Sequence, residues 1–528
     1  MTAPPPCIVH EDHDLLVVAK PAGWNTHAPS PYAGEGIYDW LRHREPRWAT
    51  LALVQRLDKD TSGILLLAKS RQAARSLTDQ LATRDAEKRY VFITDRSPAK
   101  NAWSVESSIV RVGARYRTSA SGDGQPAETR FEVLRRESGR TWVVARPLSG
   151  RTHQIRVHAA DSGVPILGDS LYGGSPFSRV CLHAEEITVR HPATGERVTF
   201  RVAVDFDADS NVALRAAFIE PTETDCYRVL HGAADGEPGW RVDRLGAYLL
   251  SQSEGPLSDA RRARLEEMLA CWQLSGAYHK QLDRRVRESD VEHSSPRLAL
   301  GEEAPDRFVV RENGIAYELS FAEGYSVGLF LDQRDNRRRL LTGHIGTDFP
   351  IELAGVELLN VFAYTCSFAV CAARAGARTT SLDLSKKYLA WGARNFELNG
   401  IAPAEHDFIF GDAFDWMRRL AKKGRRFSVI VLDPPTFSQS NRSGTFRAET
   451  DFGKLVAAAA PLLGPGGALL TSTNAAQLDP ESFLDTITAS LVASGRRIER
   501  RHYVPQPPDF PVSSREPAYL KTCWWRVS

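Results

Sequence analysis

The sequence has few cysteines, and they form neither a disulfide framework nor a metal-binding pattern. The seven cysteines stand at positions 7, 181, 226, 271, 366, 371 and 523, with no CxxC pair and no Cys/His group at zinc spacing. We therefore expect reduced thiols and no bound metal.

Long apolar runs are also missing. No window approaches about 18 uninterrupted apolar residues, and the first residues do not place a basic segment before an apolar one. We expect a cytoplasmic protein without a membrane partner. The composition, 42% hydrophobic and 25% charged, is that of an ordinary globular chain.

The sequence also lacks a strong excess of positive or negative charge, since its net charge is only +2. This total does not exclude a nucleic-acid partner, because binding depends on a local patch of charge. Positive charge is concentrated at 146–156, 334–339 and 418–426, although such runs are more often solvated faces.

The pattern of strands and helices divides the 528 residues into several units, more than one core can hold. Residues 1–206 contain short Val/Ile/Leu-rich strands and few helices, which predicts a mostly antiparallel α+β domain. A linker follows at 203–223, and residues 215–310 predict a small α+β domain. From 311 to 528, buried strands alternate with amphipathic helices, which predicts a doubly wound, Rossmann-like α/β domain with a parallel sheet.

The first candidate site is the segment Gln55-Arg56-Leu57-Asp58-Lys59-Asp60-Thr61-Ser62-Gly63, directly before a strand. Loops at a sheet rim often carry function. Asp58 and Asp60 could equally cap a turn with the hydroxyls that follow them. On these residues alone both interpretations stay open.

Four further blocks favour the functional interpretation: KRY at 88–90, RPLSGRTHQIRVH at 146–158, GDSLYGG at 168–174 and LHAEEI at 182–187. Together with RLD at 56–58 they resemble, in order and spacing, the RluA family of pseudouridine synthases. The resemblance implies that Asp58 attacks the uridine sugar or abstracts its proton, without a cofactor. It also implies that Tyr90 stacks on the flipped uracil, that Arg156 pairs with Asp58, and that Arg56 occupies the space left by the base.

These implied roles are physically coherent. A buried nucleophilic carboxylate must stay ionised, and an adjacent guanidinium opposes the rise in pKa that burial causes. Stacking on an aromatic ring returns part of the free energy spent on base flipping. Gln55 stands where the family usually has His, which could alter RNA contacts without removing the nucleophile.

The second candidate site begins with the strand-to-helix loop at 358–368. Asp383 ends the next strand, Asp412 follows the third, and Asp433-Pro434-Pro435 ends the fourth, where ribose and base contacts are expected. These elements resemble a class I S-adenosylmethionine-dependent methyltransferase. The blocks at 236–246, 328–337 and 433–437 more narrowly resemble the RlmI/RlmK group of 23S rRNA methyltransferases.

That resemblance implies a set of S-adenosylmethionine contacts. Asp383 would hold the ribose, Asp412 the adenine amino group, and the first loop the methionine part, while Asp433 would border the methyl group and the target base. The implied cofactor-binding residues are Asn360, Phe362, Tyr364, Thr365, Asp383, Ser385, Asp412, Asp433, Pro434 and Pro435. Cys366 stands where many relatives have Gly, and a buried small thiol is its expected role.

The methylated atom can be argued from chemistry. Methylation at pyrimidine C5 requires a cysteine adduct at C6. The resemblance implies that C5-methylcytosine members carry this cysteine on the strand end after the GG turn, where this sequence reads Leu-Thr-Ser-Thr-Asn at 470–474, without a cysteine. Guanine N7 already carries a lone pair and needs only positioning. The sequence therefore favours guanine N7.

We expect a two-headed enzyme acting on structured RNA, 23S rRNA for the methyltransferase and 23S rRNA or tRNA for the synthase. One alternative keeps a single active half and makes the other a degenerate RNA-binding adaptor. Another gives the methyltransferase a protein or small-molecule substrate. A basic rim formed around Asp433 by 334–339 and 438–450 would favour RNA, the latter segment being a mobile loop or an ordinary surface loop. Target nucleotides and oligomeric state are not determined by the sequence.

Overall fold

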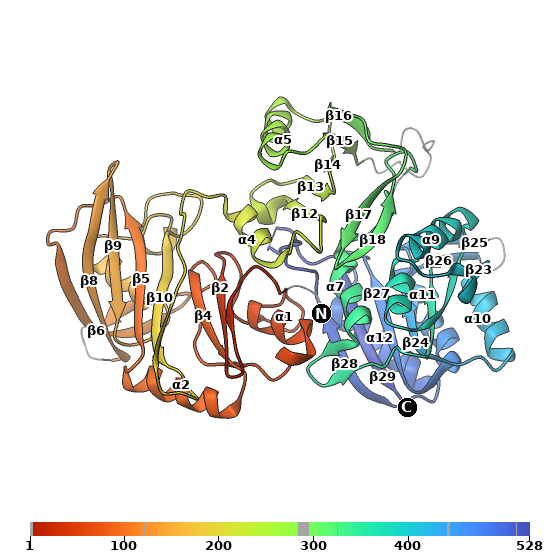
Figure 1. Cartoon of the computed structure of the whole chain (residues 1–528), viewed down its shortest axis with the longest axis horizontal. Helices are drawn as coiled ribbons and strands as arrows, with labels where there is room; N and C mark the ends of the chain where they lie inside the picture. The colour runs from red at the N-terminus through yellow and green to blue at the C-terminus, as the bar shows by residue number, and fades with distance from the viewer. Residues whose placement is uncertain (1–3, 120–122, 283–294, 325, 441–443, 514) are drawn as a thin grey trace.

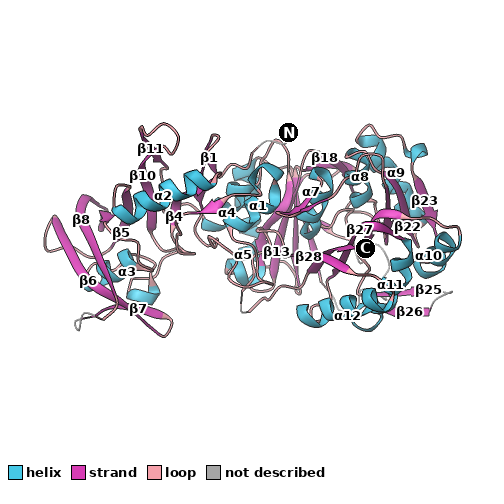
Figure 2. Ribbon diagram, turned by 90° about the horizontal axis from the view of Figure 1, so that it is seen from below, coloured by secondary structure: helices cyan, strands magenta, loops and turns pink. Residues whose placement is uncertain are grey.

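The computed structural model describes residues 4–119, 123–282, 295–324, 326–440, 444–513 and 515–528. The chain forms an N-terminal half and a C-terminal half that lie side by side along the long axis, with a smaller unit above their junction (Figures 1 and 2). The expected multidomain fold class is confirmed. Among the described residues, no helix has the length and apolar character needed to cross a membrane.

The N-terminal half is built on one eleven-stranded sheet, in the order β1-β2-β4-β10-β5-β9-β8-β6-β7, with β3 beside β4 and β11 beside β10. Its pairings are antiparallel apart from β10 with β4. β4 is buried along its whole length, so the strand after the Asp58 loop is a fixed base for that loop. The strands are β1 Ile8–Glu11, β2 Leu15–Lys20, β3 Ala52–Leu53, β4 Ser62–Ala68, β5 Glu87–Thr94, β6 Ala102–Val112, β7 Arg115–Ser119, β8 Gln125–Glu137, β9 Arg140–Pro147, β10 Leu182–Arg190 and β11 Arg197–Arg201.

Three α-helices, α1 Ile37–Arg44, α2 Arg71–Thr83 and α3 Gln154–Asp161, accompany this sheet. α2 begins at Ser70, whose hydroxyl accepts the N–H of Ala73, a typical helix N-cap. α3 begins after His153, which has a left-handed backbone with φ of 57°. The His153 side chain lies near the Asp58 loop, as the distances below show.

A helix and a small sheet follow. α4 Ser210–Phe218 begins at Asp209, whose carboxylate accepts two backbone N–H groups. The five-stranded sheet runs in chain order, with α5 Asp259–Trp272 connecting the parallel pair β14 and β15. Its strands are β12 Cys226–His231, β13 Trp240–Leu245, β14 Tyr248–Ser253, β15 Gly276–Gln281 and β16 Arg297–Gly301, and the hairpin β17 Phe308–Glu312 with β18 Ile315–Leu319 leads to the last unit.

The C-terminal sheet has seven strands in the order β23-β22-β21-β24-β27-β29-β28. The first five are parallel, but β29 is antiparallel to β27 and to β28, so the predicted parallel sheet is correct only for its first five strands. The strands are β21 Glu357–Val361, β22 Arg378–Asp383, β23 Asp407–Phe410, β24 Phe427–Leu432, β27 Leu463–Thr473, β28 Ile498–Val504 and β29 Lys521–Val527. The helices are α7 Arg334–Thr342, α8 Ser367–Arg374, α9 Lys386–Leu398, α10 Ala413–Lys422, α11 Ala448–Ala459 and α12 Pro480–Ala493.

The sequence suggested that the arginine-rich stretch 334–339 is a solvated face or part of a basic rim around Asp433. Both interpretations are wrong. The stretch forms the first turns of α7, where all four arginines are buried. Arg334 pairs with Asp509 (Nη1–Oδ2 2.8 Å) and Arg337 with Glu312 (Nε–Oε1 2.6 Å). Charge compensation by distant carboxylates makes this stretch part of the core.

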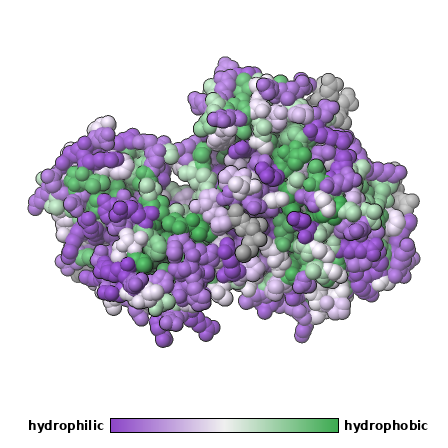
Figure 3. Space-filling view, viewed as in Figure 1, coloured by the Kyte–Doolittle hydropathy of each residue, from purple (hydrophilic) through white to green (hydrophobic). Residues whose placement is uncertain are grey.

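On the outside, hydrophilic residues cover most of the face seen in Figure 3, with apolar residues in separate patches.

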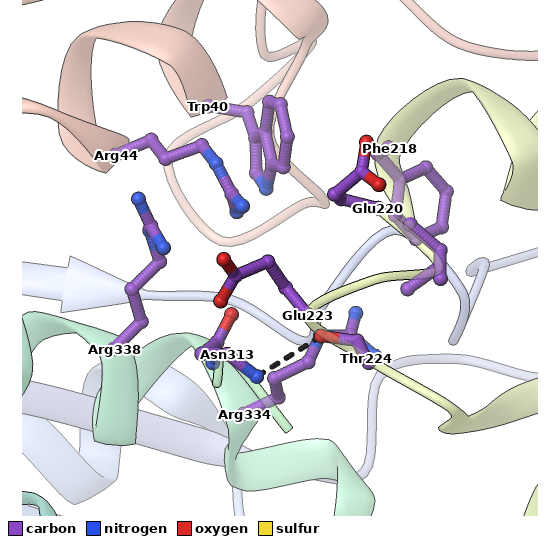
Figure 4. Close-up of a pocket in the computed structure, with 10 residues that line it drawn as sticks. Trp40, Arg44, Phe218, Glu220, Glu223, Thr224, Asn313, Arg334 and Arg338 are labelled. Carbon is purple, nitrogen blue, oxygen red and sulfur yellow. Dashed lines mark hydrogen bonds between the residues drawn. The ribbon is translucent and has the colours of Figure 1, made fainter. Parts of the chain in front are cut away.

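The two halves meet where α1 lies beside α7 and β19 (His344–Gly346). Here Arg338 pairs with Glu45, and the Nε2 of His344 lies 2.9 Å from the carbonyl oxygen of Arg42. Figure 4 shows the polar part of this junction, a cavity of about 10 Å³ beside the N–H of Asn313, which donates to Thr224 Oγ1. The residues around it are Trp40, Arg44, Phe218, Ile219, Glu220, Glu223, Thr224, Asn313, Arg334 and Arg338.

Candidate active sites

The N-terminal candidate site is a cleft of about 790 Å³ that contains Asp58, Tyr90 and Arg156 in its lining. Asp58 comes from the loop before β4, Tyr90 from β5 and Arg156 from α3. Arg56 lines the same cleft and is exposed. The structure therefore brings together all four residues that the sequence analysis selected for this half.

The Asp58 loop is held from beneath by buried polar groups. Lys20 Nζ donates to the carbonyl oxygens of Trp24 (2.7 Å) and Lys59 (3.1 Å), and burial lowers the pKa of Lys20 to about 7. Thr26 Oγ1 donates to the carbonyl oxygen of Leu57 at 2.7 Å. These bonds fix the backbone on both sides of Asp58.

Arg156 has two carboxylate neighbours. It makes a bidentate pair with Asp169, Nε–Oδ2 2.6 Å and Nη2–Oδ1 2.8 Å, in which both side chains are almost fully buried. Its third nitrogen, Nη1, lies 3.7 Å from Asp58 Oδ2. Burial alone would lower the pKa of Arg156, but the hydrogen bond to Asp169 raises it. Arg156 is therefore a fixed positive charge beside Asp58, held there by Asp169.

His153 is a further neighbour of Asp58, to which the sequence analysis assigned no role. Its Nε2 lies 3.9 Å from Asp58 Oδ2, and its Nδ1 lies 2.7 Å from the hydroxyl of Tyr172. That hydroxyl also accepts the backbone N–H of Tyr116 at 3.0 Å, so Tyr172 links His153 to β7. Burial lowers the pKa of His153. The sequence signal for His153 is its place in the HQIR block. The sequence alone could not show that His153 contacts Tyr172.

Tyr90 is half-buried at the floor of the cleft. Its ring packs against the apolar clusters on both sides of β5, and burial together with the Asp58 charge raises the pKa of its hydroxyl. A neutral, fixed ring at this position presents a surface on which a base can stack.

The C-terminal candidate site lies at the carboxyl ends of four neighbouring parallel strands. Asp383 ends β22, Asp412 follows β23, and Asp433 follows β24. The register places Val361 of β21 opposite both Leu382 and Leu432, so the three aspartates and the loop after β21 share one edge of the sheet. This is the edge at which doubly wound sheets bind ligands.

Two backbone N–H groups orient the Asp383 carboxylate. Its Oδ2 accepts the N–H of Tyr364 at 2.9 Å, and its Oδ1 accepts the N–H of Ser385 at 2.8 Å. Burial raises its pKa, and the backbone N–H donors oppose that rise. Ser385 and Asp412 each cap a helix, α9 and α10, by accepting a backbone N–H.

The loop between β21 and α8 has an unusual backbone. Phe362, Tyr364 and Cys366 all have positive φ, at 61°, 49° and 62°. Left-handed non-glycine residues cost roughly 1 kcal/mol or more each and concentrate at functional sites. Cys366 is fully buried, and burial raises the pKa of its thiol to about 12, which agrees with the expected buried thiol.

Asp433 lies against the block at 328–337. Gln333 Nε2 donates to Asp433 Oδ1 at 3.2 Å and to Ser472 Oγ at 2.6 Å. Burial raises the pKa of Asp433 to about 6, and the nearby Asp332 charge adds to the rise. Pro434 is buried behind it and Pro435 is exposed.

These residues fit S-adenosylmethionine. An ionised carboxylate has about four lone-pair positions, so Asp383 keeps acceptor capacity for ribose hydroxyls beyond its backbone donors. Asn360, at the end of β21, has a buried Nδ2 with no hydrogen-bond partner among the described residues. The Thr365 hydroxyl, in contrast, already has a hydrogen-bond partner within the protein, because it donates to the carbonyl oxygen of Gly328 at 2.7 Å.

The described part of the segment 438–450 forms regular secondary structure, so neither expected description, a mobile loop or an ordinary surface loop, fits it. β25 Phe437–Ser440 and β26 Gly444–Arg447 pair as an antiparallel hairpin, and α11 follows directly. Residues 441–443, which fall in this segment, lie outside the described residues.

Comparisons with known proteins match each half separately. The family model described as S-adenosylmethionine-dependent methyltransferase matches residues 245–526, more than half of the chain. The chain belongs to this family. The model described as RNA pseudouridylate synthase matches residues 14–161, so the N-terminal half is a synthase domain fused to the methyltransferase.

Relatives of both kinds are found. A ribosomal RNA large subunit methyltransferase of Deinococcus radiodurans is 33% identical over 328 residues, covering 60% of this chain and 78% of the relative. A ribosomal large subunit pseudouridine synthase C of Yersinia pestis is 38% identical over 212 residues, covering 38% of this chain and 66% of the relative. The chain thus spans about two thirds of that synthase.

A solved structure resembles the methyltransferase half. SMU.776, a candidate methyltransferase crystallised with SAH, superposes with a TM-score of 0.51 at 27% identity, covering 64% of this chain and 86% of that chain. The cofactor of the methyltransferase half is S-adenosylmethionine. The synthase half needs none.

Proposed function

We propose that the chain is a bifunctional RNA-modification enzyme, with a synthase domain at 1–206, a small central domain at 215–310 and a methyltransferase domain at 311–528. The observation that carries this proposal is that each half retains a complete set of polar groups in one place. Asp58 has Arg156 beside it, and Asp383, Asp412 and Asp433 share one edge of the methyltransferase sheet. A degenerate adaptor would have no reason to keep both sets.

In the synthase half, Asp58 is the group that reacts with the flipped uridine, by attacking its sugar or removing a proton. Arg156 places a positive charge 3.7 Å from the Asp58 carboxylate, and Tyr90 stacks on the uracil. Arg56 is exposed at the mouth of the cleft, which suits a residue that fills the space left in the RNA. The base then turns and rejoins the sugar through carbon, so no atom is lost and no cofactor is needed.

In the methyltransferase half, bound S-adenosylmethionine supplies an electrophilic methyl group. Asp383 would hold its ribose and Asp412 its adenine amino group, while Asn360 and the strained loop from Phe362 to Tyr364 would hold the methionine part. Asp433, Pro434 and Pro435 would border the target base. Gln333 aims the Asp433 carboxylate by a hydrogen bond.

We propose guanine N7 of large-subunit rRNA as the methyl acceptor. Thr471, Ser472 and Thr473 end β27 beside Asp433, and none can form the thioether adduct that C5 methylation needs. Cys366 is fully buried with a strongly raised pKa, so it is no source of thiolate. N7 requires only alignment with the methyl group.

The RNA substrate rests on the relatives, whose names assign them to the ribosomal large subunit. The basic rim that would have supported RNA at the methyltransferase site is not present at 334–339, because those arginines are buried. The test is incubation of the purified chain with unmodified 23S rRNA and with tRNA, with S-adenosylmethionine carrying a labelled methyl group. Nuclease digestion and mass spectrometry should reveal pseudouridine and 7-methylguanosine in rRNA, whereas label in C5-methylpyrimidine would refute the N7 assignment.

A further inference from the structure

A compact group of metal-ligating side chains lies at the junction of the two halves, far from both active sites in the chain. Glu35 precedes α1 and His43 lies in its last turn, whereas His502 belongs to β28 of the methyltransferase sheet. One ligand atom from each residue lies within 4.8 Å of the other two, and no second group of this kind occurs among the described residues. We propose that Glu35, His43 and His502 bind one divalent transition-metal ion, with Zn²⁺ as the matching metal, and thereby fasten the synthase half to the methyltransferase half.

The donor set fits this ion. Imidazole nitrogen and carboxylate oxygen are ordinary Zn²⁺ ligands at about 2.0–2.2 Å, and three protein ligands leave a fourth position for water. Tetrahedral geometry at those bond lengths places the donor atoms roughly 3.3–3.5 Å apart. His43 Nδ1 and Glu35 Oε1 are now 2.5 Å apart in a hydrogen bond, so metal binding widens this contact by less than about 1 Å and releases its proton.

His502 gives the observation that a hydrogen-bonded junction alone does not explain. Its Nε2 is buried and has no hydrogen-bond partner among the described residues. Its ring meets the His43 ring edge to face, with centroids 4.5 Å apart, and packs on its other side against Gly346. A buried polar atom without a partner calls for a ligand, and a metal ion between His43 and Glu35 would supply one.

A cationic side chain lies beside the three candidate ligands. Arg339 Nη2, 3.7 Å from Glu35 Oε1, opposes a cation there, and its guanidinium is partly engaged by the carbonyl oxygen of Ile345.

Such an ion would add a link between α1 and β28 to the contacts that already cross the junction. Next to the site, Tyr32 and Tyr503 pack edge to face at 5.1 Å, and His344 bonds to the Arg42 carbonyl oxygen. A metal bridge between α1 and β28 would therefore keep the two catalytic clefts in a constant relative orientation. The sequence predicted no metal because its cysteines and histidines lack metal-ligand spacing, whereas these three ligands come from opposite ends of the chain.

The test uses the full-length chain without a histidine tag, stripped with a chelator and dialysed against a small excess of Zn²⁺. We expect one equivalent of bound zinc by elemental analysis, a thermal unfolding midpoint raised by a few degrees, and the intense visible bands of tetrahedral cobalt when Co²⁺ replaces Zn²⁺. His43→Ala and His502→Ala should each retain less than a tenth of the bound metal. Glu35→Gln, which keeps an oxygen acceptor for His43, should weaken Zn²⁺ binding at least tenfold and covers the case in which the alanine variants do not fold.

The matched control is His191→Ala, which removes a histidine that lies 3.1 Å from the Asp12 carboxylate, outside the junction. This variant should keep one equivalent of zinc. The proposal is overturned if the wild-type chain binds no zinc, if His43→Ala, His502→Ala and Glu35→Gln bind as much as the wild type, or if the metal is lost on His191→Ala instead. Neither enzyme assay enters the test, so its result is independent of the proposed function.

Discussion

Arg156 and Asp169 form a two-point ion pair inside the synthase half, and this pair sets where the guanidinium stands relative to Asp58. The Nε and Nη2 atoms are taken by Asp169 at 2.6 and 2.8 Å, which leaves Nη1 facing Asp58 Oδ2 at 3.7 Å. Asp169 therefore acts through Arg156, as a positioning residue for the carboxylate that reacts.

Removing Asp169 tests this relationship. Asp169→Ala leaves a buried arginine without its partner, and we expect the free energy of unfolding to fall by about 3–5 kcal/mol. Asp169→Asn keeps the shape and one acceptor, so it should fold but lose pseudouridine synthesis at least tenfold. Urea denaturation and a single-turnover assay on uridine-containing RNA measure the two effects. Full activity of a folded Asp169→Asn variant would show that the pair has no positioning role.

Replacements of Tyr90 separate stacking from hydroxyl chemistry. If the ring is the functional part, Tyr90→Phe should retain RNA binding and most activity, whereas Tyr90→Ala should lose about 1–3 kcal/mol of stacking free energy. Binding of RNA that contains 5-fluorouridine, measured by filter retention, compares the two variants. Equal losses for Phe and Ala would assign the role to the hydroxyl instead.

The raised pKa of Asp433 predicts a pH-dependent effect on stability. The pKa of about 6 lies above that of an unfolded carboxyl, so the folded protein holds this proton more tightly between roughly pH 4 and 6. The contribution of Asp433 to the free energy of unfolding therefore decreases as pH rises through that range and stays low above it.

Asp433→Asn should remove this pH dependence. We expect the variant to be more stable than the wild type by roughly 2–3 kcal/mol at pH 8 and equal to it near pH 4, while it loses methyl transfer. Thermal unfolding at several pH values checks the stability, with the exposed Asp485→Asn as a control that should follow the wild type throughout. A constant difference at all pH values would contradict the assigned titration.

Gly392 tests the packing beneath the strained loop. A Cβ on this α9 residue would stand 2.3 Å from Cys366 Sγ and 2.8 Å from its Cβ. Gly392→Ala should therefore push the left-handed Cys366 turn outward, destabilise the protein by about 1–3 kcal/mol and weaken S-adenosylmethionine binding. Calorimetric titration with the cofactor measures the latter, and Gly255→Ala, where a Cβ meets nothing within 4 Å, is the matched control.

The placement of the methyltransferase aspartates could be predicted because it follows from local rules. Alternating strands and helices force Asp383, Asp412 and Asp433 to the carboxyl ends of neighbouring strands, whichever long-range contacts form. The start of helix α5, Asp259–Trp272, likewise follows from a local signal, because Ser258 accepts the backbone N–H of Arg261 as an N-cap. The reversed direction of β29 was missed because strand patterns carry no direction.

The environment of the arginines could not be predicted. The stretch 334–339 reads as a charged surface, and only the folded chain brings Glu312, Asp509 and Glu45 to it from distant positions. The same holds for Asp169 and Tyr172, which lie in a block that was noticed but whose partners depend on the packing of α3. Ion pairs between distant segments are set by tertiary structure rather than by local sequence.

The most direct test of the bifunctional assignment is a map of modified nucleotides in RNA from cells that carry the wild-type gene, no gene, Asp58→Ala or Asp433→Ala. The account predicts that Asp58→Ala removes specific pseudouridines and leaves the methylated guanine, and that Asp433→Ala does the reverse. Pseudouridine that persists unchanged in the Asp58→Ala strain, or rRNA methylation that persists in the Asp433→Ala strain, would contradict it.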